Sequence, residues 1–230
     1  MVKAGSRQVH DRSGQFHVWD FIVDRRAQIL INALNHAYLV ILCVIFATVI
    51  AIALAVLVTR MPKLEPVASA VSAIGLTIPS FALVGLLLPV TGLGDGTALA
   101  AVTFYAVLPI LRNAVVGLQG VDANLLESAR GMGMSEVASL LRVRIPLAWP
   151  VILAGIRISL QMSMGIAAIA AYVLGPGLGV SIFTGLAQIG GKNAVSYAAV
   201  GTVGIVVVAL LLDALLLLAG RLTTSKGIRV

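Results

Sequence analysis

Long apolar runs separated by short charged segments dominate this sequence. The runs cover residues 37–58, 67–90, 97–111, 148–173 and 195–218. A helix needs about 20 mostly apolar residues to cross the hydrocarbon of a bilayer. The pattern therefore predicts an all-α integral membrane protein with about five transmembrane helices.

Two of these runs are interrupted by proline. Ile78-Pro79-Ser80 breaks the second run, and a proline inside a helix removes a backbone donor, so this span should kink or split. The third run is short and meets Pro109 and then Arg112. It either ends within the membrane or continues past the proline.

A glycine-rich segment precedes a sixth apolar stretch. Gly175, Gly177 and Gly179 flank Pro176, and residues 180–189 are apolar but too few to cross a bilayer. Irregular backbone at membrane depth is tolerated where protein or a water-filled cavity covers it. We expect a short re-entrant or interfacial helix here, and a six-span protein is the alternative.

Composition supports a membrane protein. Hydrophobic residues make up 60% of the chain and charged residues 11%, whereas soluble domains carry roughly 25% charged residues. The net charge is +7, but the basic residues lie between apolar runs, which is typical of a topology signal. We therefore expect membrane lipid around the chain and no nucleic-acid partner.

The basic residues also predict the orientation. With residues 112–147 in the cytoplasm, Arg60, Lys63 and the tail 220–230 also fall inside, and the outer loops hold only Lys192. Five spans then place residues 1–36 outside as a partly amphipathic tail, before a permease domain at 37–219. That tail carries five basic residues against the rule, which keeps six spans open.

The charged segment at residues 121–146 has the pattern of two short helices. Apolar residues recur near helical spacing, and Gly131 and Gly133 would turn the chain between the helices. The apolar positions are Leu125, Leu126, Ala129, Met132, Val137, Leu140 and Leu141. Such a segment suits docking into a partner's groove, although periodicity alone fits a loop packed on its own spans equally well.

This segment resembles the EAA loop of binding-protein-dependent ABC importer permeases. The resemblance rests on Glu127-Ser128-Ala129, Gly133 and Val143-Arg144-Ile145-Pro146, with Ser128 in place of the usual alanine. It implies a coupling helix that seats on a nucleotide-binding ATPase subunit. The implied coupling residues are Glu127, Ser128, Ala129, Gly133 and Pro146.

From about residue 30 onward the chain is similar to the osmoprotectant branch of that family. The similarity lies at residues 77–80, 105–113, 125–134, 155–157 and 175–179. It implies import of glycine betaine, carnitine or choline, with a translocation path or gate at Pro79, Ser80, Tyr105, Gly175, Gly177 and Gly179. Leu76 and Pro176 depart from the branch, which leaves the solute open.

Three alternatives to osmoprotectant import remain. The same machinery could move methionine or another amino acid. A secondary transporter would need paired broken helices, and one broken span is visible. A membrane scaffold without transport would leave the EAA spacing unexplained.

The sequence offers no nucleotide site of its own. The nearest P-loop candidate, residues 186–193, has Leu186 where glycine is needed and Asn193 where Ser or Thr is needed. We expect a transport subunit and no enzyme, with ATP and Mg on a partner ATPase and no cofactor on this chain. His10, His17 and His36 lie away from any Cys or carboxylate cluster, so we expect no metal site, and His36 is expected at the membrane interface.

The resemblance also implies further partners. Quaternary ammonium groups are bound by aromatic cages, and this chain has few aromatic residues. A separate extracytoplasmic binding protein should supply the cage, while Tyr105 and Tyr172 pack or line a weak site. A second copy or a paralogous permease should complete the path, in a prokaryotic plasma (inner) membrane.

Arg157 and Asp213 are lone charges in the fourth and fifth spans. A charge at the centre of a membrane helix costs roughly 2.5–3.5 kcal/mol on insertion scales. Both lie roughly 10–13 Å from the cytoplasmic end at about 1.5 Å per residue. We therefore predict an intramembrane ion pair, and the alternative is that each side chain reaches water separately.

Overall fold

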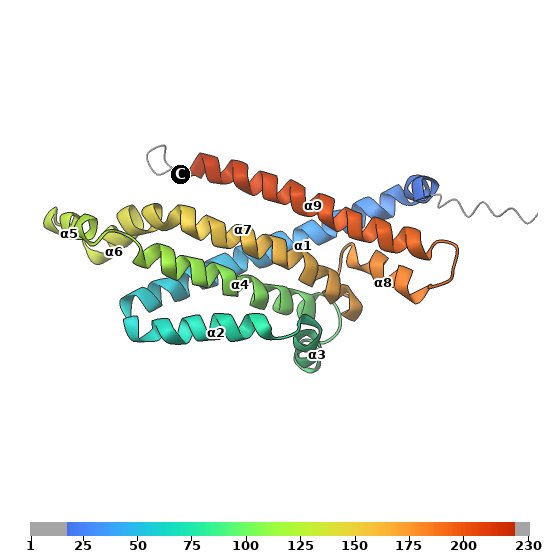
Figure 1. Cartoon of the computed structure of the whole chain (residues 1–230), viewed down its shortest axis with the longest axis horizontal. Helices are drawn as coiled ribbons and strands as arrows, with labels where there is room; N and C mark the ends of the chain where they lie inside the picture. Colours follow the sequence, from blue (N-terminus) through green and yellow to red (C-terminus); the bar gives the residue numbers. More distant parts are fainter. Residues whose placement is uncertain (1–17, 224–230) are drawn as a thin grey trace, which may run out of the picture.

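The computed structural model describes residues 18–223, which form an elongated bundle of helices with no strand among them (Figure 1). The α-helices are α1 (Val18–Arg60), α2 (Glu65–Thr77), α3 (Ser80–Thr91), α4 (Asp95–Gln119), α5 (Ala123–Gly131), α6 (Glu136–Ser139), α7 (Ile145–Ala170), α8 (Gly179–Ala187) and α9 (Ala194–Thr223). Shorter elements are the 3₁₀ turns η1 (Pro62–Leu64) and η3 (Ala171–Val173) and the π-helical turn η2 (Leu140–Arg144).

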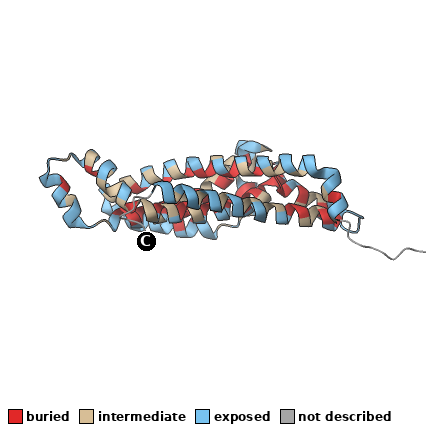
Figure 2. Ribbon diagram, turned by 90° about the horizontal axis from the view of Figure 1, so that it is seen from above, coloured by how far each residue is buried: buried red, intermediate tan, exposed pale blue. Residues whose placement is uncertain are grey.

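The core lies where α4 packs against α7 and α1. Buried residues line the inside of the bundle and exposed ones its outside (Figure 2). α1 contributes Ala47, Ala51 and Ala55, all fully buried and spaced at four residues along one stripe. Small residues let membrane helices approach closely, and a Cβ added at Gly155 of α7 would lie 2.7 Å from the Asn113 side chain of α4.

The number of spans agrees with the prediction. Within residues 18–223, four helical segments are long and apolar enough to cross a membrane, and a fifth span results if α2 and α3 count as one. The chain bends by 98° between them, so the predicted break at Pro79 is confirmed. α4 continues through Pro109 to Gln119, so the third span does not end within the membrane but extends past the proline.

The first helix starts earlier than the hydropathy pattern indicates. α1 is continuous from Val18, so residues 18–36 of the predicted tail belong to it, while residues 1–17 and 224–230 lie outside the described part. Its first turns pack on the start of α9, where the rings of Phe21 and Tyr197 are 4.7 Å apart and Arg25 lies against both. Charged residues such as Asp24 and Arg26 interrupt the apolar pattern by which spans were recognised, but they do not interrupt the helix.

Candidate functional site

The loop between α4 and α7 forms the two predicted short helices. Asp122 caps α5 by accepting from the backbone N–H of Asn124 at 2.8 Å, and Ser135 caps α6 by accepting from Ala138. Gly133 joins the helices with a φ of +81°, a conformation that glycine adopts without steric cost. The local sequence therefore forms two capped short helices joined by a turn rather than an irregular loop.

This loop extends from one end of the bundle (Figure 1). Glu127 and Ser128 are exposed on α5, whereas Ala129 is buried, and Pro146 is exposed in the first turn of α7. Glu127 lines a shallow hollow with Leu126 and Arg130. An exposed apolar and charged helix beyond the spans fits docking better than a loop packed on its own spans.

At the broken span, Tyr105 reaches across from α4. Its hydroxyl donates a hydrogen bond to the carbonyl oxygen of Ile78, the residue before Pro79. Because the helix breaks at this point, that carbonyl lacks the hydrogen bond that a continuous helix would provide. Tyr105 is buried, Pro79 is exposed, and Ser80 is half-buried at the start of α3. Through Ile78, Tyr105 therefore lies at the break that contains the predicted path residues Pro79 and Ser80.

The predicted gate glycines lie in close packing. Gly175, Gly177 and Gly179 are all buried, and a Cβ at Gly179 would lie 2.2 Å from the Ala168 carbonyl oxygen of α7. Gly177 has a φ of +118° and abuts His36. Close backbone contact accounts for these glycines without reference to a gate.

His36 was expected at the membrane interface, but the structure buries it completely. Its Nε2 lies 3.2 Å from the Met164 carbonyl oxygen of α7. The polar ring fits inside the bundle because Gly177 leaves room for it. The contact between His36 and Met164 depends on tertiary packing, so the position of His36 at the edge of an apolar run could not predict it.

The structure brings Arg157 and Asp213 together. Arg157 Nε donates to Asp213 Oδ1 at 2.5 Å and Nη2 donates to Oδ2 at 2.7 Å, which is the two-point geometry of a strong guanidinium–carboxylate pair. Gln161 adds a contact to Oδ1 at 3.3 Å. The Arg157 side chain nevertheless remains 43% exposed.

Three aromatic rings meet at the end of the bundle opposite α5. Phe81 of α3, Tyr172 of η3 and Phe183 of α8 have ring centroids 5.5–6.3 Å apart. Phe81 and Tyr172 are about half to two-thirds exposed. Sequence reasoning singled out Tyr172 alone, because no spacing signal links residues that come from three separate elements.

Together these features define a multi-pass α-helical membrane protein that has a broken span and a helical loop beyond one end. Residues 47–224 match the family described as binding-protein-dependent transport system inner membrane component, and the chain belongs to this family. It is accordingly a membrane transport subunit of the inner membrane.

The chain is similar to curated permeases along nearly all of its length. It is 36% identical over 213 residues to the choline transport system permease protein OpuBB of Bacillus subtilis, covering 93% of this chain and 96% of that protein. It is also 36% identical to the glycine betaine/carnitine/choline transport system permease protein OpuCB of Bacillus subtilis, with coverage of 91% and 94%. The osmoprotectant import permease protein OsmW of Salmonella typhimurium is 36% identical, with coverage of 91% and 98%.

Solved structures show the same fold. A chain of the MetNI methionine ABC transporter in an inward-facing conformation aligns with a TM-score of 0.71 at 23% identity, covering 90% of this chain and 99% of that one. A second crystal form aligns with a TM-score of 0.67 at 24% identity, covering 88% and 96%.

Proposed function

We propose that this chain is the permease subunit of an ABC importer that moves a small osmoprotectant such as glycine betaine, carnitine or choline into the cell. The observation that carries the proposal is the 36% identity, over nine-tenths of the chain, to permeases named for these solutes. The MetNI likeness is one of fold and does not favour methionine.

The aromatic cluster formed by Phe81, Tyr172 and Phe183 supports this choice of solute. Quaternary ammonium groups bind over aromatic faces, with an attraction of about 0.5–1 kcal/mol at exposed sites. The rings pack on one another and so form a surface rather than a closed cage. Such a surface suits transient contact after release from a separate extracytoplasmic binding protein.

ATP hydrolysis belongs to a partner ATPase in this proposal. α5 and its C-terminal end present Leu125, Glu127 and Met132 outside the bundle, where a docking helix would need them. The segment between α4 and α7, residues 120–144, is accordingly called the coupling loop. The end that carries α5 is then cytoplasmic, in agreement with the basic residues at Arg60 and Arg144.

A second permease copy or a paralogue completes the path. The Arg157 side chain is 43% exposed and Gln161 is exposed within a membrane span. Charged groups at this depth face protein or water rather than lipid. The α7 face around Arg157 therefore meets another subunit or a water-filled path.

The test is ATP hydrolysis by the complex reconstituted with its ATPase and binding protein. Glycine betaine, carnitine or choline should stimulate hydrolysis, and methionine should not. Stimulation by methionine alone would replace the proposed solute. Failure of the permease to assemble with any ATPase would reject the importer assignment itself.

The aromatic cluster gives a sharper test of the path. Tyr172→Leu should reduce transport of a quaternary ammonium solute severalfold, whereas Tyr172→Phe should retain it, because the ring and not the hydroxyl makes the contact. Tyr38→Leu is the matched control, since Tyr38 is similarly exposed but lies on α1. Equal losses in Tyr172→Leu and Tyr38→Leu would remove the cluster from the path.

A further inference from the structure

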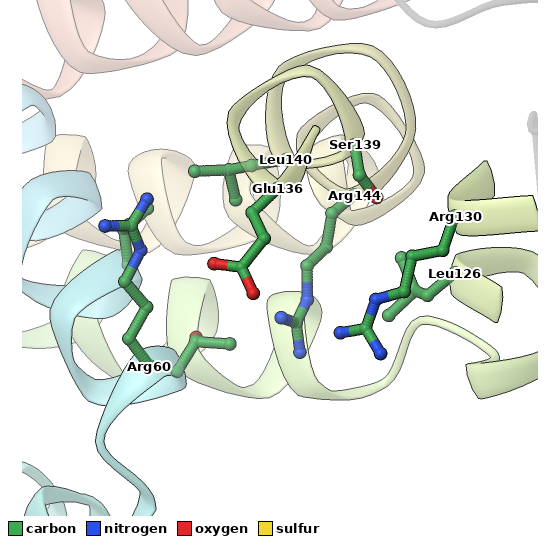
Figure 3. A pocket seen from close by; sticks show the side chains of 9 residues that line it. Arg60, Leu126, Arg130, Glu136, Ser139, Leu140 and Arg144 are labelled. Carbon is green, nitrogen blue, oxygen red and sulfur yellow. The ribbon is translucent and has the colours of Figure 1, made fainter. Parts of the chain in front are cut away.

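A hollow of about 330 Å³ lies between the end of α1 and the coupling loop (Figure 3). Val56, Thr59 and Arg60 of α1 line it on one side, and Arg130 of α5 lines it on another. Glu136 of α6 and Arg144 at the end of η2 complete the polar lining. Four chain segments therefore meet around one charged cavity.

The charges in this cavity do not balance. Three guanidinium groups, those of Arg60, Arg130 and Arg144, converge on it together with the single carboxylate of Glu136 (Figure 3). Arg144 is fixed, since its Nε donates to the Leu118 carbonyl oxygen of α4 at 2.8 Å, and burial together with repulsion from the Arg130 charge lowers the pKa of its guanidinium. A bound anion would relieve this repulsion.

Phosphate is the anion that this donor set suits. Guanidinium groups bind phosphate oxygens through paired, charge-assisted hydrogen bonds. A lipid phosphodiester carries one negative charge on two free oxygens, which can accept hydrogen bonds from guanidinium groups of two chain segments at once.

The depth of the cavity indicates where the phosphate comes from. Val56 and Thr59 belong to the last turn of α1 before Arg60, where the first span ends. The cavity is thus level with lipid headgroups, and basic pockets at this level bind anionic headgroups. Glu127, the exposed carboxylate of the docking surface, does not line this cavity but lines the adjoining hollow on α5, which shares Leu126 and Arg130 with it.

We propose that the cavity formed by Arg60, Arg130, Glu136 and Arg144 binds the phosphate group of an anionic phospholipid from the adjacent leaflet. The bound headgroup bridges α1 to α5 and to the start of α7, and so stiffens the base of the coupling loop. The inner-leaflet location rests on the orientation proposed above, whereas the binding site itself does not depend on the transported solute.

The experiment measures lipid retention by native mass spectrometry on the permease–ATPase complex, supplied with phosphatidylglycerol or phosphatidylcholine. The wild type should retain phosphatidylglycerol selectively. Arg130→Gln or Arg60→Gln should each weaken retention about fivefold, the usual contribution of one basic residue near an anionic surface. Glu136→Gln should strengthen it, because the variant removes the negative charge in the cavity.

Arg142→Gln is the matched control. Arg142 is a basic, exposed residue of η2 that does not line the cavity, so its loss should leave retention unchanged. Arg130→Lys should retain more of the binding than Arg130→Gln, since it keeps the charge but loses the paired hydrogen bonds of the guanidinium. Opposite effects of Arg130→Gln and Glu136→Gln would distinguish a phosphate site from a purely structural role.

Four results would overturn the proposal. One is equal retention of both lipids by the wild type, and another is equal retention of phosphatidylglycerol by all variants. Loss of the ATPase from Arg130→Gln, with lipid unchanged, would assign the cavity to the subunit interface. Protection of the complex from thermal unfolding by inorganic phosphate in the absence of lipid would assign it to a soluble anion.

Discussion

Arg157 and Asp213 join α7 to α9 through two parallel hydrogen bonds, with Nε–Oδ1 at 2.5 Å and Nη2–Oδ2 at 2.7 Å. The position of this pair matters because α9 packs closely at its start alone. Its buried residues all lie between Ala194 and Gly201, and residues 202–223 are exposed or half-buried. The ion pair, a hydrogen bond from Trp149 to Thr223 at 2.9 Å and half-buried apolar side chains such as Leu212 hold the rest of α9 to the bundle.

We expect that removing one member of the pair destabilises the protein more than removing both. Asp213→Leu leaves the Arg157 charge in the membrane without its partner, whereas Arg157→Leu/Asp213→Leu leaves an apolar contact between α7 and α9. The melting midpoint of the detergent-purified protein should therefore fall further in each single variant than in the double variant.

Gln161→Leu serves as the control for the ion pair. Gln161 contacts Asp213 at 3.3 Å without a formal charge, so its loss should have the smallest effect of the set. A double variant that melts below both single variants would show that the pair itself, rather than the avoidance of a stranded charge, provides the stability.

Gly133→Ala should impair the coupling loop, whereas Gly131→Ala should be tolerated. Both glycines have open space around a new Cβ, but Gly133 alone of the two has a positive φ, +81°. Alanine in the left-handed region costs roughly 1–2 kcal/mol, which corresponds to about a 5- to 30-fold loss of the correctly turned loop. ATP hydrolysis stimulated by the loaded binding protein is the measurement.

Asparagine tests whether backbone conformation is the cause. Gly133→Asn should recover part of the activity lost in Gly133→Ala, because asparagine enters the left-handed region more readily. Equal activity of Gly131→Ala and Gly133→Ala would mean that the turn tolerates other conformations.

Tyr105→Phe should lower the free energy of unfolding by about 0.5–1.5 kcal/mol, the usual net contribution of one hydrogen bond. The acceptor is the Ile78 carbonyl at the break between α2 and α3, which the Tyr105 hydroxyl satisfies. Denaturant or thermal unfolding in detergent measures the change. Tyr197→Phe is the comparison, since Tyr197 contacts Phe21 and Arg25 through its ring, and an equal loss there would exclude the carbonyl as the cause.

Thiol labelling checks the orientation of the bundle. Gln188 is exposed just after α8, and Met132 is 72% exposed in the coupling loop. In a Cys43→Ser background, which removes the single native cysteine, Gln188→Cys should react with an impermeant reagent from outside. Met132→Cys should react from the cytoplasm alone, and the reverse pattern would invert the topology.

The sequence by itself determined that this protein lies in lipid, where its helices run, and where the segment between α4 and α7 turns. Apolar runs of about 20 residues require lipid on physical grounds alone, and Pro79 and Gly133 set a break and a turn through local backbone chemistry. The depth of Arg157 and Asp213 along their helices was also readable, because rise per residue converts sequence position into membrane depth.

The tertiary structure decided which side chains meet. Phe81, Tyr172 and Phe183 come from three elements, and Arg60 joins Arg130 and Arg144 from 70 or more positions away, so no spacing rule connects them. The upstream reach of α1 and the burial of His36 depend on packing against α9, α7 and the Gly177 loop. Hydropathy measures preference for lipid or water and carries no information about which helix faces which, since that is set by close packing between surfaces distant in the chain.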